Sequence, residues 1–170
     1  MGGASGNSLM QIHSVHSDND IEMVRSLFGE YEDFLQVDLS FQRFDAERSQ
    51  LPGRYAPPDG DLLIAMIGKE PAGCVAMRKI EPRVCEMKRL FVRPEFWGRG
   101  LGMRLALEII KRAKHAGYET MFLDTLNHLE AAMRLYARVG FRQRPPYYQN
   151  PLPEVIYWEL NLVNFTTLFY

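Results

Sequence analysis

The segment from Lys88 to Ala116 constrains the fold more than any other part of the sequence. A strand-like apolar run ends at Pro94, a turn with three alternate glycines follows, and residues from Met103 onward have the spacing of an amphipathic helix. Glycine lets a backbone turn tightly and approach a ligand closely, and the amides that open a helix have no partner within it. The glycine turn is therefore predicted to hold a phosphate or pyrophosphate group.

Length and composition indicate one globular domain. The chain has 170 residues, of which 46% are hydrophobic and 24% charged, as in ordinary globular proteins. A net charge of −1 gives no basic surface for nucleic acid or an anionic membrane. No apolar run approaches the roughly 20 residues that span a bilayer. We therefore expect neither nucleic acid nor membrane as a partner.

The two ends of the chain and its cysteines indicate where the protein is found and which partners to expect. Residues 1–8 are rich in glycine and serine and lack the apolar stretch of a signal peptide, which predicts a disordered tail before a single domain at 9–170 and a cytoplasmic protein. Cys74 and Cys85 are too few for a disulfide framework or a metal site, so we expect no metal. The apolar segment 163–170 could cover its own core or pack on a second copy, which leaves a homodimer open.

Hydrophobic periodicity predicts an alternation of strands and helices. The order is mixed α and β, with a hairpin meander that feeds a strand–turn–helix–strand unit. The predicted strands are 10–15, 61–67, 72–80, 84–92, 118–126, 141–144 and 155–162, and the predicted helices are 20–35, 41–51, 103–116 and 129–139.

Three motifs in this order resemble the GNAT superfamily of N-acetyltransferases, over roughly residues 10–162. The family loop Arg/Gln-x-x-Gly-x-Gly/Ala aligns with residues 97–102, although Trp97 stands where the family usually has Arg or Gln. The family helix Ala-x-x-Leu-Tyr-x-x-x-Gly-Phe matches residues 132–141 in full. Leu123-Asp124-Thr125, at the end of the preceding strand, is similar to one bacterial branch.

The resemblance implies an acyl-CoA acyltransferase fold of the α/β (α+β) class, with a mixed, mostly antiparallel central sheet of about seven strands flanked by helices. It also implies acetyl-CoA as the acetyl donor, held in a V-shaped opening between the strands 84–92 and 118–126. The backbone of Leu90, Phe91 and Val92 would contact the pantetheine arm of the coenzyme. The pyrophosphate would lie against the turn Gly98, Arg99, Gly100, Leu101, Gly102 and Met103. Asn127 is a further implied contact, although the strict family position is Leu129.

Acetyl transfer to an amine needs a base, because an alkyl ammonium with a pKa of about 10.4 is mostly protonated at neutral pH and cannot attack. By the resemblance, Glu86 falls where the histone-acetyltransferase branch keeps its catalytic glutamate. Two alternatives are open: Glu86 could pair with Lys88, Arg89 or a neighbouring strand, and a water chain could take the proton instead.

The resemblance places the Tyr136 hydroxyl near the coenzyme sulfur, where it could protonate the departing thiolate; a core tyrosine is the alternative. A strand amide near Leu90 or Phe91, opened by a local bulge, would stabilise the oxyanion. Strand alternation puts Cys85 and Glu86 on opposite faces, and a buried cysteine is a poor nucleophile. We therefore expect direct attack in a ternary complex.

The acceptor is expected to be a primary amine of a small molecule. Its pocket would form from the first helices, the end of the strand 118–126 and the loop 145–153, with Thr125, Tyr147, Tyr148 and Asn150 as candidate contacts. Alternatives are a protein lysine or N-terminus, which would need an open groove, and a non-catalytic acyl-CoA sensor. A nucleotide-phosphate enzyme is disfavoured, because the Lys-Ser/Thr ending of the NTPase loop is absent.

Overall fold

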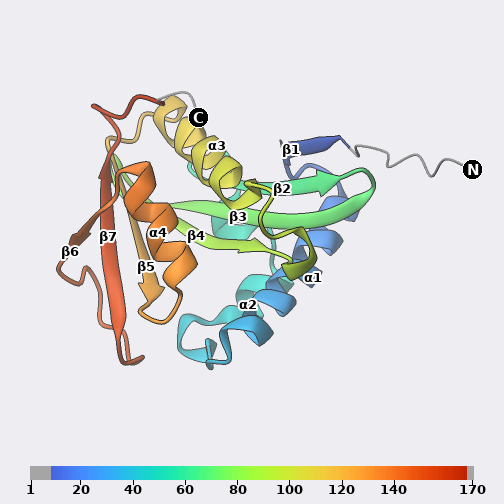
Figure 1. Ribbon diagram of the computed structural model, residues 1–170, viewed down its shortest axis with the longest axis horizontal. Helices are drawn as coiled ribbons and strands as arrows, with labels where there is room; N and C mark the ends of the chain where they lie inside the picture. The colour runs from blue at the N-terminus through green and yellow to red at the C-terminus, as the bar shows by residue number, and fades with distance from the viewer. Residues whose placement is uncertain (1–8, 168–170) are drawn as a thin grey trace, which may run out of the picture.

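The computed structural model describes residues 9–167, which form seven strands and four α-helices (Figure 1). The predicted disordered tail at residues 1–8 lies outside the described residues, as do residues 168–170. The strands are β1 Met10–Ser14, β2 Asp61–Ile67, β3 Glu70–Glu81, β4 Val84–Val92, β5 Thr120–Leu126, β6 Arg142–Arg144 and β7 Val155–Asn161. The helices are α1 Asp18–Leu35, α2 Phe44–Ser49, α3 Leu101–His115 and α4 Glu130–Val139.

All seven strands belong to one sheet, in the order β1-β2-β3-β4-β5-β7-β6. β4 and β5 pair in parallel, and every other pair of neighbours is antiparallel. This arrangement confirms the mixed, mostly antiparallel sheet predicted from the sequence. The parallel pair stands at the centre of the sheet, where α3 provides the crossover connection between its two strands.

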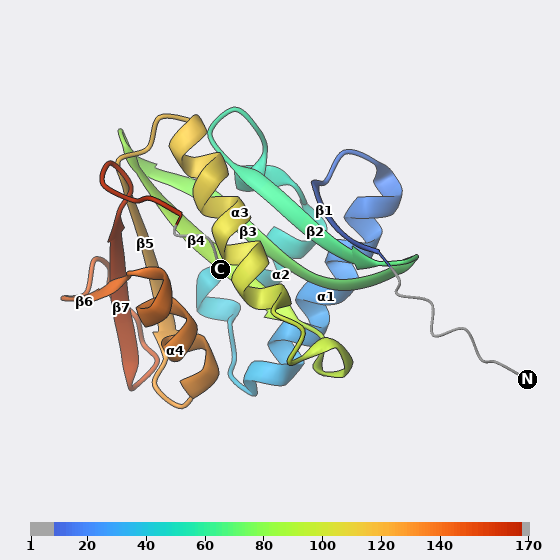
Figure 2. The ribbon, with the colours of Figure 1, turned by 45° about the horizontal axis from the view of Figure 1, so that its top comes forward.

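Helices cover both faces of the sheet, with α3 and α4 on one face and α1 and α2 on the other (Figure 2). The side chains of β2 alternate between two apolar clusters: Leu63 packs with α3, and Leu62 and Ile64 pack with α1 and α2. Both layers are closed by fully buried helix residues such as Leu105 on α3 and Phe28 on α1. Among the helices of residues 9–167, none combines the length and the apolar character needed to cross a bilayer.

The predicted helix 41–51 is the element that differs most from the structure. It is divided into a short 3-10 turn, Ser40–Gln42, and α2. Arg43 lies between them in the left-handed conformation, with φ of 56°. A non-glycine residue in this region interrupts helical hydrogen bonding, so the chain changes direction and brings Gln42 against β4.

Candidate active site

The central feature of the site is the separation of β4 from β5. The two strands pair only from Val84 to Glu86 on β4, although β4 continues to Val92 and β5 to Leu126. On the other side of β4, the register with β3 shifts between the Cys74–Phe91 and Ala76–Lys88 pairs, which marks a bulge. Arg89 within this bulge has φ of 59°. The bulge expected near Leu90 is therefore present, in the part of β4 that no longer pairs with β5.

A cavity of about 900 Å³ occupies the gap between the diverging strands. Its walls come from β4, the glycine turn, α4, the end of β5 and the segment after α1. Of the residues predicted as site residues, those that line the cavity are Leu90, Phe91, Val92, Gly98, Gly100, Leu101, Gly102, Met103, Thr125, Tyr136 and Asn150. Arg99, Asn127, Glu86, Tyr147 and Tyr148 are not among its described lining residues, whereas Leu129, the strict family position, is.

The glycine turn approaches the cavity with backbone rather than side chains. Gly98 and Gly100 have φ of 76° and 74°, values that L-residues with side chains rarely adopt. Gly100 is the N-cap residue of α3, so the amides of the first helical turn open toward the cavity without intrahelical partners. A Cβ on Gly102 would lie 3.3 Å from Leu135 on α4. This end of the cavity suits an anionic diphosphate.

Trp97 replaces the charged or amide side chain usual at its position and fastens the turn to β4. Its indole Nε1 donates a hydrogen bond of 2.8 Å to the carbonyl oxygen of Val92, and its ring meets Phe34 edge-on with centroids 5.9 Å apart. The side chain is 56% exposed and lines the cavity. Trp97 therefore anchors the glycine turn to the end of β4.

Tyr136 projects from α4 into the cavity wall and is only 7% exposed. Its ring packs against Phe141 and Trp158, with centroids 5.7 and 6.3 Å away. Burial raises the pKa of its hydroxyl above the ordinary value of 10.0, so the phenol stays protonated at neutral pH. A protonated hydroxyl at this place can donate a proton or a hydrogen bond.

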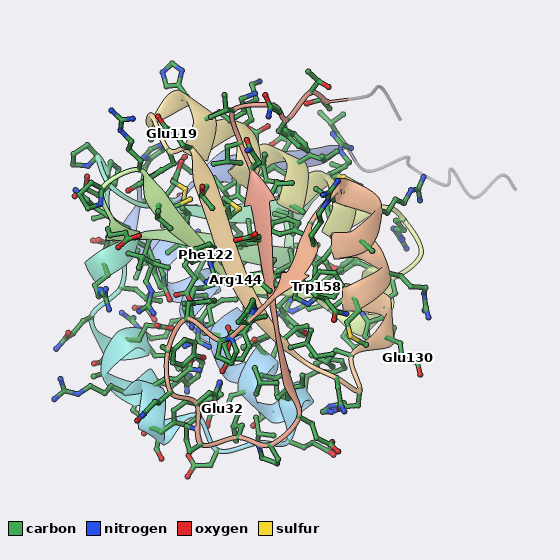
Figure 3. The ribbon with its side chains drawn as sticks, turned by 90° about the vertical axis from the view of Figure 1, so that its left-hand side faces the viewer. Glu32, Glu119, Phe122, Glu130, Arg144 and Trp158 are labelled. Atoms are coloured by element: carbon green, nitrogen blue, oxygen red, sulfur yellow. The ribbon has the colours of Figure 1, made fainter. Side chains whose placement is uncertain are left out.

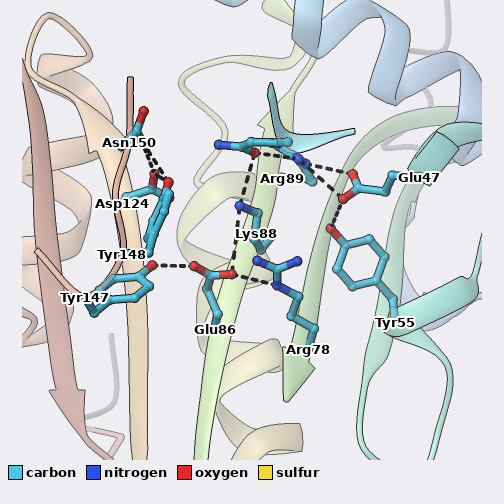
Figure 4. A network of polar contacts seen from close by, with 11 residues as sticks. Glu47, Tyr55, Arg78, Glu86, Lys88, Arg89, Asp124, Tyr147, Tyr148 and Asn150 are labelled. Atoms are coloured by element: carbon cyan, nitrogen blue, oxygen red, sulfur yellow. Dashed lines mark hydrogen bonds and ion pairs between the residues drawn. The ribbon is translucent and has the colours of Figure 1, made fainter. Parts of the chain in front are cut away.

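Glu86 lies in a closed network of polar contacts (Figure 4). Its carboxylate is 2.7 Å from Nε of Arg78 and 3.8 Å from Nζ of Lys88, and it accepts a hydrogen bond from the hydroxyl of Tyr147. Burial is the largest single influence and would raise its pKa, but the charges of Lys88 and Arg78 and the hydrogen bonds from Tyr147 and Arg78 together lower it. The ion-pair alternative for Glu86 is thus realised, and its role as a base stays a prediction.

A second carboxylate, Asp124 on β5, lines the cavity itself. Its Oδ2 accepts hydrogen bonds from the hydroxyl of Tyr148 and, at 3.3 Å, from Nδ2 of Asn150. Sequence reasoning treated Asp124 only as part of a family motif. The signal it missed was a carboxylate near the carboxyl end of a half-buried strand, beside the point where the sheet opens.

The loop 145–153 is fastened beside the end of the cavity that Asp124 lines. Tyr147 reaches Glu86 on β4, and Tyr148 reaches Asp124 on β5. Just before the loop, the guanidinium of Arg144 lies 4.0 Å from the centroid of the Phe122 ring (Figure 3). Asn150 and Leu152 then border the cavity. The loop therefore contributes Asn150 and Leu152 to the cavity wall and is held to both strands of the gap.

Comparison with known proteins agrees with this geometry. Residues 22–141 match the model of the acetyltransferase (GNAT) family. An uncharacterised N-acetyltransferase of Schizosaccharomyces pombe is 41% identical over 157 residues, which cover 91% of this chain and 96% of that protein.

Two solved structures show the same fold. The crystal structure of a proposed acyl-CoA N-acyltransferase from Klebsiella pneumoniae has a TM-score of 0.73 at 25% identity and covers 92% of this chain and 99% of that one. The PaiA N-acetyltransferase of Thermoplasma acidophilum, solved in complex with coenzyme A, has a TM-score of 0.71 at 16% identity and covers 90% and 99% of the two chains. This chain belongs to the GNAT family and is an acetyl-CoA-dependent N-acetyltransferase.

Proposed function

We propose that this enzyme transfers the acetyl group of acetyl-CoA to a primary amine of a small molecule, by direct attack in a ternary complex. The observation that carries the proposal is the loop 145–153, which Tyr147 and Tyr148 hold against β4 and β5 at the acceptor end. A protein lysine or N-terminus would need an open groove at this place. A small amine fits the part of the cavity that lies between Asp124 and the loop residues Asn150 and Leu152.

Direct attack is supported by the shape of the cavity and the state of the cysteines. One cavity extends from the glycine turn to Asp124 and Asn150, so both substrates can be present together. Burial raises the pKa of Cys85 to about 12, and it also raises that of Cys74. Neither thiol is ionised at neutral pH, and an acetylated cysteine is therefore not expected as an intermediate.

The proposed reaction begins when the neutral amine attacks the thioester carbonyl carbon, with the oxyanion bound by amides of the β4 bulge near Leu90 and Phe91. As the carbon–sulfur bond breaks, Tyr136 protonates the leaving thiolate. The nitrogen loses one proton to a carboxylate as it bonds to the carbonyl carbon. Solvent then takes this proton from the carboxylate and returns one to the Tyr136 phenolate. Asp124 suits that role better than Glu86, because it lines the cavity, whereas the Glu86 oxygens accept hydrogen bonds from Arg78 and Tyr147.

Thiol release from acetyl-CoA in the presence of small amines tests the proposal, and Tyr136→Phe tests the acid. The variant is expected to lower kcat by about 100-fold, because it removes the proton donor and keeps the ring. Its affinity for coenzyme A, measured by calorimetry, should not change. Tyr118→Phe is the matched control, since that hydroxyl donates to the Asp59 carbonyl. An unchanged kcat in Tyr136→Phe would leave this residue as part of the core only.

Gly102→Val tests the coenzyme end of the cavity. The new Cβ would lie 3.3 Å from Cδ1 of Leu135 and 3.8 Å from Cγ2 of Val92, so the added methyl groups would occupy space between β4 and α4. The affinity for coenzyme A is expected to fall by about tenfold or more at unchanged helical content. Calorimetry and circular dichroism measure the two quantities. Full affinity in this variant would show that the coenzyme binds elsewhere.

A further inference from the structure

The acceptor end of the cavity carries fixed charges of both signs. Asp124, Lys88 and Arg89 all line the same 900 Å³ cavity. Building on the proposed function, we infer that the acceptor is an amine that also carries a carboxylate, which binds at Lys88 and Arg89 while its amine faces Asp124. The acceptor is then an amino-acid-like zwitterion rather than a simple amine or a polyamine.

Of the three cations Arg78, Lys88 and Arg89, Lys88 is the least well paired. Arg78 and Arg89 each hydrogen-bond to a carboxylate: Glu86 at 2.7 Å and Glu47 at 2.9 Å (Figure 4). The Lys88 ammonium is 3.8 Å from Glu86, beyond hydrogen-bond distance, and donates only a long bond of 3.3 Å to the neutral Gln42. An ammonium has three donors, so Lys88 keeps capacity for an anionic ligand.

The surroundings of Lys88 make such a ligand favourable. The Lys88 side chain is only 5% exposed, and burial lowers its pKa more than the charges of Glu86 and Asp124 raise it. The positive charges of Arg89 and Arg78 also lower the pKa of Lys88. An anion bound beside Lys88 would offset this repulsion between cations. A carboxylate bound here would supply the partner that Glu86 provides only at a distance.

A second, smaller cavity gives the anionic group room. It measures about 190 Å³, and it shares Gln42, Lys88 and Arg89 with the main cavity. Arg78 and Tyr148 line it as well. Lys88 and Arg89 therefore form a basic wall that borders both spaces, next to the point where Asp124 meets the acceptor.

The charges near the basic wall select which acceptors can bind with complementary charge. Arg78 neutralises Glu86 and Arg89 neutralises Glu47, which leaves one negative group, Asp124, and one positive group, Lys88. A zwitterionic acceptor presents the complementary pair of charges. The second ammonium of a diamine would instead face Lys88 and Arg89, and like-charge repulsion would exclude it.

Matched acceptors test the inference on the whole enzyme. We would measure thiol release for a set of amino acids, for their amides, for the amines that lack the carboxylate, and for diamines. The carboxylate-bearing member of each set is expected to have a kcat/KM higher by about tenfold or more. Equal kcat/KM for all members, or a preference for diamines, would overturn the inference. Absence of thiol release with every amine, at normal coenzyme binding, would instead overturn the proposed function.

Variants at the basic wall test whether Lys88 causes the preference for carboxylate-bearing acceptors. Lys88→Met is expected to lower the preference for the carboxylate-bearing member by about tenfold, mainly through KM, and Lys88→Arg should retain it. The control is Lys79→Met on β3, an exposed lysine whose nearest acidic partner is Asp59 at 3.9 Å. An undiminished preference in folded Lys88→Met would contradict the assignment.

A measurement on the unmodified enzyme covers the case in which Lys88→Met does not fold. With coenzyme A bound, calorimetry would compare an N-acetylated amino acid with its amide. Tighter binding of the acid is expected, because it alone can pair with Lys88. Equal affinity would overturn the inference.

Discussion

Asp124→Asn is expected to lower kcat/KM for the acceptor amine by about 10²- to 10⁴-fold, the range for loss of a general base. The amide has the shape of the carboxylate and can still accept the bond from Tyr148, so the loop 145–153 should keep its place. The measurement is thiol release as a function of pH. Coenzyme affinity, which depends on the opposite end of the cavity, should stay as it is.

Glu86→Gln provides the matched comparison, since both variants convert one carboxylate to its amide. Folded Glu86→Gln is expected to lose much less activity than Asp124→Asn, because Glu86 does not line the cavity and the bonds to Arg78 and Tyr147 occupy its oxygens. The reverse order of effects would restore Glu86 as the base.

The same Glu86→Gln change is expected to lower the free energy of unfolding substantially, although its effect on activity is small. Removing the charge leaves Lys88 and Arg78 without their acidic partner in a site where Glu86 is only 1% exposed. Breaking a buried ion pair in this way costs about 3–5 kcal/mol in the free energy of unfolding. Denaturant titration measures it. Glu119→Gln is the control: its pair with Arg83 is exposed, so the loss should stay within about 1 kcal/mol.

The pH dependence of unfolding gives an independent check on Glu86. Its pKa in the folded protein is lower than the ordinary value of 4.5, so its contribution to stability is fully present above pH 4.5. That contribution is lost as the pH falls from 4.5 through the lowered pKa. Glu86→Gln should lack this part of the acid destabilisation. A variant that loses stability in acid as steeply as the parent would contradict the ion-pair account.

Features that depend on neighbouring residues in the chain could be predicted from the sequence. The glycine turn and α3 follow from local spacing, and so does the end of α4 at Gly140, which has φ of 116°. The division of the predicted helix 41–51 could not be predicted, because Arg43 adopts a left-handed conformation with no glycine or asparagine to signal it. The next residue, Phe44, is 1% exposed and stacks on Phe28, a tertiary contact that local sequence does not signal.

The polar part of the site depends on residues far apart in the sequence. Glu86 and Tyr147 are 61 residues apart, and Asp124 and Tyr148 are 24 apart. Sequence motifs select the two strands and the loop, but they do not show which tyrosine meets which carboxylate. That assignment follows from the order β4-β5-β7-β6, which brings the loop back to the edge of the gap. The position of Lys88 and Arg89 on the cavity wall likewise follows from the separation of β4 and β5 and from no local sequence pattern.

The exposed position of Trp97 beside the cavity has a consequence for the fluorescence of the enzyme. The chain has two tryptophans. Trp158 is buried at 5% exposure beside Tyr136, whereas Trp97 is largely exposed and lines the cavity. Emission from a solvated indole lies at longer wavelength than emission from a buried one, so the two contribute separable parts of the fluorescence spectrum. Occupation of the cavity changes the environment of Trp97 directly, which makes the red edge of that spectrum an intrinsic reporter of ligand arrival.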